Sequence, residues 1–209
     1  GKNSAHWIMS DLAIWMAGYV TVPLYPTLNA DTAQYVLEHS EVKALFIGKL
    51  DGEADSWNQV KEIIPAHMPC ISMPLAPAYN AKKWDDIIRD TAPITNPTLP
   101  DPDALATIIY TSGSTGQPKG VLHSFRTIMK VAIELEDQFK LTPDERLLSY
   151  LPLAHALERI LIETASIYLG CHVFFANNLN TFIADLSRAR PTVFASVPRL
   201  WTKFQHGVN

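Results

Sequence analysis

The chain has 209 residues, of which 47% are hydrophobic and 18% are charged, a balance typical of a globular protein and not of a disordered one. Its formal net charge of −4 at pH 7 argues against the basic surface that nucleic-acid-binding domains carry. Cys70 and Cys171 lie far apart and form no C-x-x-C pair, which favours a reduced, cytoplasmic protein; no histidine–cysteine cluster has metal-ligand spacing.

The first residues predict an amphipathic helix. Asn3 or Ser4 is a suitable N-cap, and Gly18 is a suitable stop. Apolar residues then recur at helical spacing, which predicts that they form one buried face. These residues are Ile8, Leu12, Trp15 and Met16.

Residues 12–30 carry no charge, so a membrane helix has to be weighed against a helix followed by a strand. A spanning helix needs about 20 predominantly apolar residues. Gly18, Pro23 and Pro26 interrupt this stretch. We therefore predict a helix and then a buried strand within residues 20–26. Peripheral contact with the inner membrane stays open.

Helical and strand-like patterns continue to alternate along the first part of the chain. The predicted elements are a helix capped by Asp31 and ending near Ser40, a strand at 43–48, a helix at 57–64 and a helical turn at 84–89. This alternation predicts an α/β fold with mostly parallel sheets flanked by helices.

A proline-rich stretch divides the chain. Pro93, Pro97, Pro100 and Pro102 occupy it, and regular structure does not cross such a run. We therefore predict a first α/β subdomain at 1–92, a linker at 93–103, and a second α/β subdomain at 104–209.

The most informative segment follows a buried-strand pattern at 104–110. Residues 110–120 read YTSGSTGQPKG, in which three glycines, four hydroxyl side chains and one lysine follow the tyrosine. Glycines let the backbone approach a ligand closely, and successive amides can form an anion-binding concavity. Hydroxyls and Lys119 add donors and a positive charge. This combination suits a polyphosphate; the alternative is a flexible Gly/Ser surface loop.

The loop differs from the nucleotide-binding loop that runs directly into a helix. Pro118 precedes Lys119, removes an amide donor and fixes φ, so a helix does not continue through this point. Residues 121–124 read VLHS, which indicates a short strand. Strand, loop and strand together predict a hairpin-like phosphate clamp.

The second half again alternates between the two kinds of element. The predicted order is a helix at 125–139, a strand at 145–152, a helix at 155–169 with Leu157, Leu161 and Ile162 on its apolar side, a strand at 171–176, a helix at 181–189 and a strand at 191–198.

Residues 110–120 resemble the signature loop of the adenylate-forming superfamily: acyl-CoA synthetases, luciferases and peptide-synthetase adenylation domains. Residues 11–48, SYLPLAHALER at 149–159 and VFASVPRLWTK at 193–203 resemble segments of its long-chain acyl-CoA synthetases, in the same order. The fold implied is part of the N-terminal domain of an adenylate-forming enzyme. The family's Y-G-x-T-E and Y-x-T-G-D segments and its C-terminal catalytic lysine do not occur here, so we expect a fragment of a larger enzyme.

The resemblance implies ATP-dependent activation of a fatty acid to an acyl-adenylate, followed by transfer to coenzyme A. ATP, Mg²⁺, coenzyme A and the fatty acid would be the bound molecules, and nucleic acid would not be a partner. Thr111 would also approach magnesium. The residues implied to hold the β- and γ-phosphates are Thr111, Ser112, Gly113, Ser114, Thr115, Gly116 and Lys119.

His155 follows a proline at a strand-to-helix turn, and the resemblance places it near the acyl carboxylate and the α-phosphate. The alternative is a histidine satisfied at a helix start. We expect Glu158 and Arg159 to form a solvated or paired helix face. Arg199 and Trp201 either line an acyl tunnel or, as we favour, pack at the start of a helix.

Two alternatives to a long-chain fatty acid–CoA ligase stay open. The enzyme could adenylate another acid, in an aryl, luciferase-like or amino-acid-activating manner. The 209 residues could instead fold without turnover and only bind phosphate. The oligomeric state is also open.

Overall fold

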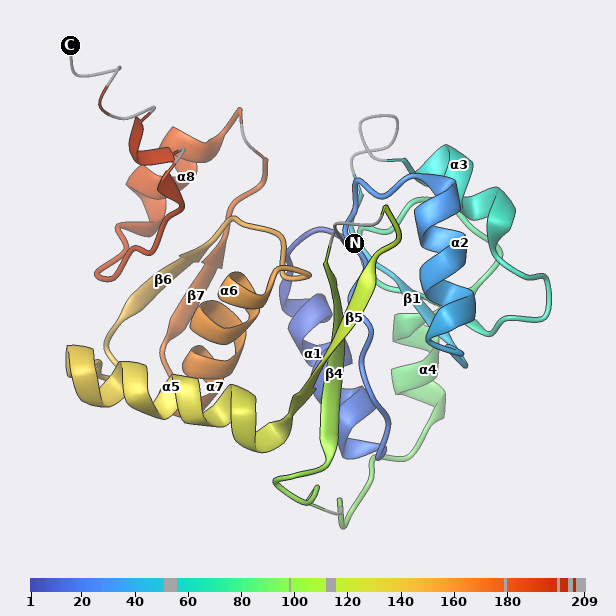
Figure 1. Ribbon diagram of the computed structural model, residues 1–209, viewed down its shortest axis with the longest axis horizontal. Coiled ribbons are helices and arrows are strands. Elements are labelled where there is room, and N and C mark those ends of the chain that lie inside the picture. Colours follow the sequence, from blue (N-terminus) through green and yellow to red (C-terminus); the bar gives the residue numbers. More distant parts are fainter. Residues whose placement is uncertain are drawn as a thin grey trace.

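The computed structural model describes residues 1–50, 56–97, 99–111, 116–178, 180–198, 200–202 and 205. Helices and strands alternate through the first half, in agreement with the predicted α/β class (Figure 1). Its elements are α1 (Ala5–Met16), α2 (Ala30–His39), β1 (Leu45–Ile47), α3 (Trp57–Ile63), β2 (Cys70–Ser72), β3 (Lys82–Lys83) and α4 (Trp84–Asp90).

The second half begins with a hairpin and continues with helices around two strands. Its elements are β4 (Leu105–Thr111), β5 (Lys119–Ser124), α5 (Phe125–Phe139), β6 (Arg146–Ser149), α6 (Ala156–Glu158), the π-helix η2 (Arg159–Thr164), α7 (Ala165–Leu169), β7 (His172–Phe175) and α8 (Phe182–Ala189). The bounds of α5 are those that the sequence predicts.

The strands form three small sheets. β1, β2 and β3 are parallel, with Leu45 opposite Cys70; β6 and β7 are parallel, with Arg146 opposite His172. Only β4 and β5, which one loop joins, are antiparallel among the described strands. This arrangement confirms the mostly parallel sheets flanked by helices.

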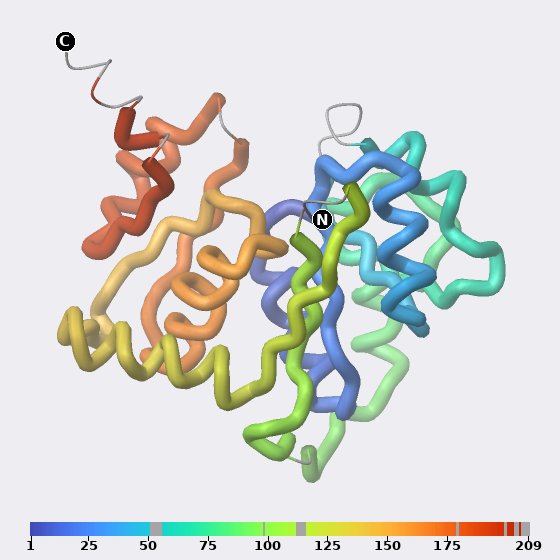
Figure 2. Tube along the Cα trace, viewed as in Figure 1, coloured from blue at the N-terminus to red at the C-terminus, as the bar shows by residue number. Residues whose placement is uncertain are grey.

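The predicted strand within residues 20–26 is largely wrong. Only Thr21 forms a bridge, to Thr107, in the described segment that runs beside β4 (Figure 2). The Thr21 N–H donates to Ala106 O at 3.1 Å, and Ile108 N–H donates to Thr21 O at 2.9 Å. Pro23 and Pro26 lack an N–H, so they cannot extend this ladder.

Helix α1 begins where the sequence predicts but buries a different face. Ser4 is the N-cap and accepts a hydrogen bond from Trp7 N–H at 3.2 Å. The buried residues are Trp7, Ser10 and Asp11, whereas Met16 is 47% exposed. The spacing of apolar residues does not predict which polar side chains are buried together with polar partners.

Two further predictions need correction. Asn29, rather than Asp31, caps α2, because its side chain accepts from Thr32 N–H at 2.8 Å. Residues 191–198, all described, form no strand. Prolines at both ends of that segment deprive it of ladder donors.

The helix predicted at 155–169 is present but irregular. Between α6 and α7, η2 follows the wider i→i+5 spacing of a π-helix, which rotates the subsequent residues relative to an α-helix. Ile162 is buried as predicted, while Leu157, which lies in α6 before η2 begins, is 37% exposed although it is on the predicted apolar side.

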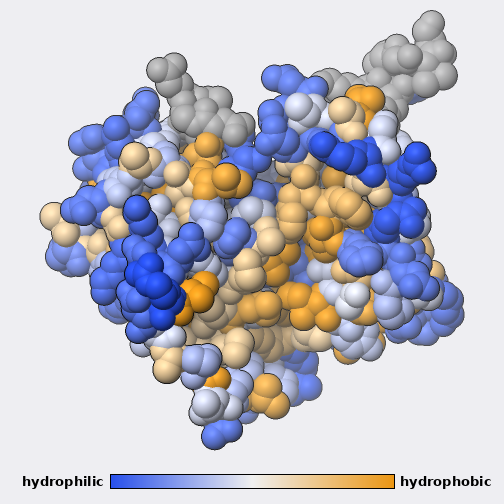
Figure 3. Space-filling model, turned by 180° about the vertical axis from the view of Figure 1, so that it is seen from behind, coloured by the Kyte–Doolittle hydropathy of each residue, from blue (hydrophilic) through white to orange (hydrophobic). Residues whose placement is uncertain are grey.

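Apolar cores lie at the two ends of the molecule. One contains Ile47, Trp57, Ile64 and Cys70, and the other is built around Leu148, Phe182 and Ala189. Seen from behind, apolar residues also gather around a hollow in the middle of the molecule (Figure 3).

The subdomain limits at 1–92, 93–103 and 104–209 stay a prediction.

Candidate functional site

The glycine-rich segment joins the two strands of a hairpin, as the sequence predicts. Thr111 and Lys119 are directly opposite each other at its tip, and both are exposed. Opposite residues of an antiparallel pair project from the same face, so this hydroxyl and ammonium flank the loop together. Gly116 has φ +89°, a conformation that favours glycine. Ser112, Gly113, Ser114 and Thr115 lie outside the described residues.

Close packing fixes the base of this hairpin. A Cβ on Gly120 would lie 2.8 Å from Ile108 Cγ2 and 3.3 Å from Tyr110 Cζ. The buried Tyr110 also makes a 2.6 Å hydrogen bond between its hydroxyl and His39 Nδ1, which ties the hairpin to α2. Sequence reasoning missed this link, because His39 lies 71 positions away and has no local signal.

His155 is exposed at the N-cap of α6. Its Nδ1 accepts a hydrogen bond from Leu157 N–H at 3.2 Å, and its backbone N–H donates to Pro152 O at 2.8 Å. In the neutral imidazole, an accepting Nδ1 assigns the hydrogen to Nε2. Nε2 would then be the donor that His155 offers to an oxygen outside the helix.

Glu158 is buried, which corrects the prediction of a solvated helix face. The residue is 3% exposed, and its Oε1 accepts from Ser149 Oγ at 2.8 Å and from Tyr150 N–H at 2.9 Å. Burial raises the pKa of Glu158 to about 7, although these hydrogen bonds oppose the rise.

Arg159 is also buried, and it is paired, which agrees with the alternative prediction of a paired helix face. Its Nη2 donates to Asp11 Oδ2 and, at 2.6 Å, to Thr21 Oγ1. The guanidinium carbon lies 5.2 Å from the ring centre of Trp7 and 5.5 Å from that of Trp15. Arg159 therefore joins α1, the segment beside β4, and η2.

A second acid lies beside this pair. Arg159 Nε is 3.8 Å from Glu163 Oε2, which is too far for a hydrogen bond. Among the described residues, Arg159 Nε and Nη1 and both Glu163 oxygens have no hydrogen-bond partner. Burial, and then the adjacent Asp11 carboxylate, raise the pKa of Glu163 well above its usual range. Burial also raises the pKa of Asp11, although the adjacent Arg159 opposes that rise.

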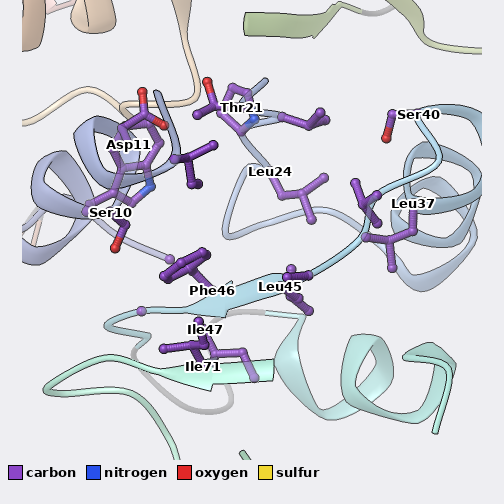
Figure 4. Close-up of a pocket in the computed structure, with 18 of the residues that line it drawn as sticks. Ser10, Asp11, Thr21, Leu24, Leu37, Ser40, Leu45, Phe46, Ile47 and Ile71 are labelled. Carbon is purple, nitrogen blue, oxygen red and sulfur yellow. The ribbon is translucent and has the colours of Figure 1, made fainter. Parts of the chain in front are cut away.

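An apolar cavity of about 770 Å³ lies between α1, α2 and β1. Asp11 and Thr21 lie on one side of it, and Phe46 and Ile71 lie on the other (Figure 4). None of the described residues of the glycine-rich loop lines this cavity, and neither does His155. The cavity is therefore separate from the hairpin tip.

The hairpin suits a magnesium ion that a polyphosphate already coordinates. Within the described ranges, no group of three or more acidic, histidine or cysteine side chains could hold a metal ion. Thr111 offers an exposed hydroxyl, a hard oxygen ligand of the type that Mg²⁺ prefers. One such ligand fits an ion coordinated mainly by substrate phosphates and water.

In the described part of the chain, no helix is long and apolar enough to cross a membrane.

Residues 1–208 match the family of AMP-binding enzymes. The chain belongs to this family. The match covers the hairpin, His155 and the buried Arg159 cluster, and it confirms the family that the sequence motifs indicate.

Curated relatives in the family are similar along the whole chain. Human long-chain-fatty-acid–CoA ligase ACSBG2 is 31% identical over 100% of this chain and 33% of its own length. Peroxisomal long chain acyl-CoA synthetase 6 of Arabidopsis thaliana is 31% identical over 99% of this chain and 31% of its own length. The chain therefore spans about a third of these relatives.

Solved structures of the family share the fold. ATP-bound MatB from Rhodopseudomonas palustris matches 97% of this chain and 39% of its own, with a TM-score of 0.76 and 23% identity. The anthranilate CoA ligase AuaEII, in complex with anthranoyl-AMP, matches 92% and 38% respectively, with a TM-score of 0.75 and 20% identity. At these identities the likeness establishes the fold alone.

Proposed function

We propose that the chain is part of a long-chain fatty acid–CoA ligase and that its hairpin loop holds the pyrophosphate portion of ATP. The observation that carries this proposal is the pairing of Thr111 with Lys119 across the glycine-rich loop. Similarity to long-chain acyl-CoA synthetases at 31% identity supports the choice of acid. Because the chain spans 33% of the human relative, the complete activity concerns a longer enzyme.

In the first step, a carboxylate oxygen bonds to the α-phosphorus of ATP, and the bond to the β-phosphate bridge breaks to release pyrophosphate. In the second step, the thiol of coenzyme A attacks the acyl carbon, loses its proton and displaces AMP. The first step brings two anions together, so it needs charge neutralisation and alignment. Neither step requires a covalent enzyme nucleophile.

The described residues would supply part of that neutralisation. Lys119 would face the β- and γ-phosphates with a compact positive charge. His155 Nε2 would donate a hydrogen bond to an oxygen on the carboxylate or the α-phosphate, since its Nδ1 is engaged with Leu157. The Thr111 hydroxyl would contact a magnesium ion bound with ATP, which would supply positive charge against the repulsion between the phosphates.

We place the protein in the cytoplasm, which the free thiols of Cys70 and Cys171 support. An alternative acid, such as an aryl acid, is the second candidate. The shared fold with an anthranilate CoA ligase supports it, because the fold does not specify the acid.

Carboxylate-dependent ATP–pyrophosphate exchange tests the proposal, with palmitate, acetate, benzoate and an amino acid as substrates. We expect palmitate to give the fastest exchange, in this chain or in the longer protein that contains it. Exchange with benzoate or the amino acid alone would favour another acid. Absence of exchange in the longer protein would contradict adenylation.

A further inference from the structure

A buried hydrogen-bond network connects the start of the chain to the segment that precedes His155. Asn3 Nδ2 donates to Ser149 Oγ at 2.7 Å and to Leu151 O at 2.6 Å. Asn3 Oδ1 accepts from Leu153 N–H at 3.0 Å. One side chain therefore holds three successive points on the path from β6 to α6, about 150 positions along the chain.

Glu158 holds the same segment at Ser149 and Tyr150. Its Oε1 accepts from Ser149 Oγ and from Tyr150 N–H, and Asn3 Nδ2 lies 3.5 Å away. Each of these groups is a donor, so they satisfy a carboxylate oxygen in a place that water does not reach. Asn3 is 9% exposed, Ser149 0% and Glu158 3%.

The position of Glu158 in α6 shows that this role differs from ordinary capping. His155 is the N-cap, so Glu158 stands at N3, where a glutamate commonly reaches back to the N-cap amide. Here the His155 amide donates to Pro152 O instead. Glu158 is thereby available to hold Ser149 and Tyr150, and the His155 side chain satisfies Leu157 N–H.

We propose that Asn3 and Glu158 are positioning residues for His155: together they fix residues 149–155 so that the imidazole accepts at Nδ1 and directs Nε2–H away from the helix. The benefit to adenylation rests on the proposed function, whereas the positioning itself does not. Residues held by two buried and mutually hydrogen-bonded polar side chains keep one geometry, which a donor to a reacting oxygen requires.

The direct test is the tautomer of His155 in the 209-residue chain without any ligand. Long-range ¹H–¹⁵N NMR of neutral histidine separates the Nδ1–H and Nε2–H forms, and the signal absent from a His155→Gln variant identifies this residue among seven histidines. We expect one dominant Nε2–H form in the native chain. Asn3→Ala and Glu158→Ala should lose that single-form signature, and Glu158→Gln, which retains an acceptor oxygen, should largely restore it.

Asn29→Ala is the matched control, because it also removes an asparagine hydrogen bond but at the start of α2. It should leave the His155 spectrum unchanged. If Asn3→Ala does not fold, Glu158→Gln compared with Glu158→Ala still decides the question. An unchanged His155 spectrum in Glu158→Ala, or an equal change in Asn29→Ala, would overturn the proposal.

Palmitate-dependent exchange separates this inference from the proposed function. In an active protein, Asn3→Ala should lower kcat with little change in the KM for ATP. A lost tautomer signature without any exchange in the native protein would contradict the proposed reaction but not the positioning. Normal kcat with a lost signature would contradict the link between them.

Discussion

The Arg159 guanidinium donates to the Asp11 carboxylate although the two side chains are only 1% and 7% exposed and stand 148 positions apart. Trp7 and Trp15 lie within cation–π distance of the same guanidinium. The pair joins α1 to η2 across the middle of the molecule, near the hairpin (Figure 1). A buried ion pair adds little net stability to the fold, because both charges lose their water on burial. Removing one partner is nevertheless costly, because the other charge stays buried alone.

Arg159→Ala should lower the free energy of unfolding by about 3–5 kcal/mol, because Asp11 would remain buried without its cation. Chemical denaturation of the variant measures this loss. Arg126→Ala is the control. Arg126 makes two hydrogen bonds to Asp103, but both side chains are exposed, so the unfolding midpoint of this variant should move little. Equal effects in the two variants would contradict the structural role of the buried pair.

The raised pKa of Glu158 predicts a pH dependence of stability. A carboxyl whose pKa is about 7 in the folded chain and near the usual 4.5 when unfolded stabilises the fold fully at low pH. That contribution, about 3 kcal/mol, is lost as pH rises from about 4.5 through about 7, because only the unfolded chain ionises freely there. Glu158→Gln should remove this part of the slope in denaturation curves across that range. An unchanged slope would contradict the burial of an ionisable Glu158.

Two glycines provide a matched test of hairpin packing. Gly120→Ala would bring a Cβ against the γ2 methyl of Ile108, whose β-branched side chain adjusts poorly, and should cost about 1–3 kcal/mol. Gly48→Ala would meet the terminal methyl of Met73, which is flexible, and would lie at an ordinary contact distance of 3.5 Å from Gly1 Cα, so it should cost much less. Thermal unfolding of both variants measures the difference. A Gly48 variant that is the more destabilised of the two would contradict this packing.

His155→Ala should slow adenylation about 100-fold, in line with the loss of one positioned donor, and should change the apparent affinity for ATP much less. The residue is exposed, so its removal should lower the free energy of unfolding by only about 1 kcal/mol, through the loss of its N-cap hydrogen bond to Leu157 N–H. Exchange kinetics across ATP concentrations separate the two effects. A large loss of affinity at an unchanged rate would count against the role.

Secondary-structure elements could be predicted from the sequence where neighbouring residues determine them. Apolar runs and turn residues correctly predicted the hairpin and the bounds of α5. The resemblance indicated the family before any three-dimensional information. Which residues hold the phosphates stays a prediction, and residues 112–115 lie outside the described residues.

The buried polar groups were not predictable in the same way. Asn3 read as a helix cap and Glu158 as a surface residue, because periodicity records apolar faces and not partners about 150 positions away. A glutamate three residues after a helix cap is the pattern of ordinary capping, so it gives no sign of the contacts with Asn3 and Ser149. The spacing of apolar residues also does not reveal the π-helix at Arg159–Thr164 inside the predicted helix.

Pyrophosphate binding tests the central claim most directly, namely that the hairpin loop is a phosphate clamp. Isothermal titration of the chain with magnesium pyrophosphate should give saturable binding that Lys119→Ala weakens about tenfold or more, as expected for a lost charge-assisted contact. Lys130→Ala, which removes an exposed lysine of α5 paired with Glu134, should bind like the native chain. Equal binding by the Lys119 and Lys130 variants, or no binding by the native chain, would contradict the account.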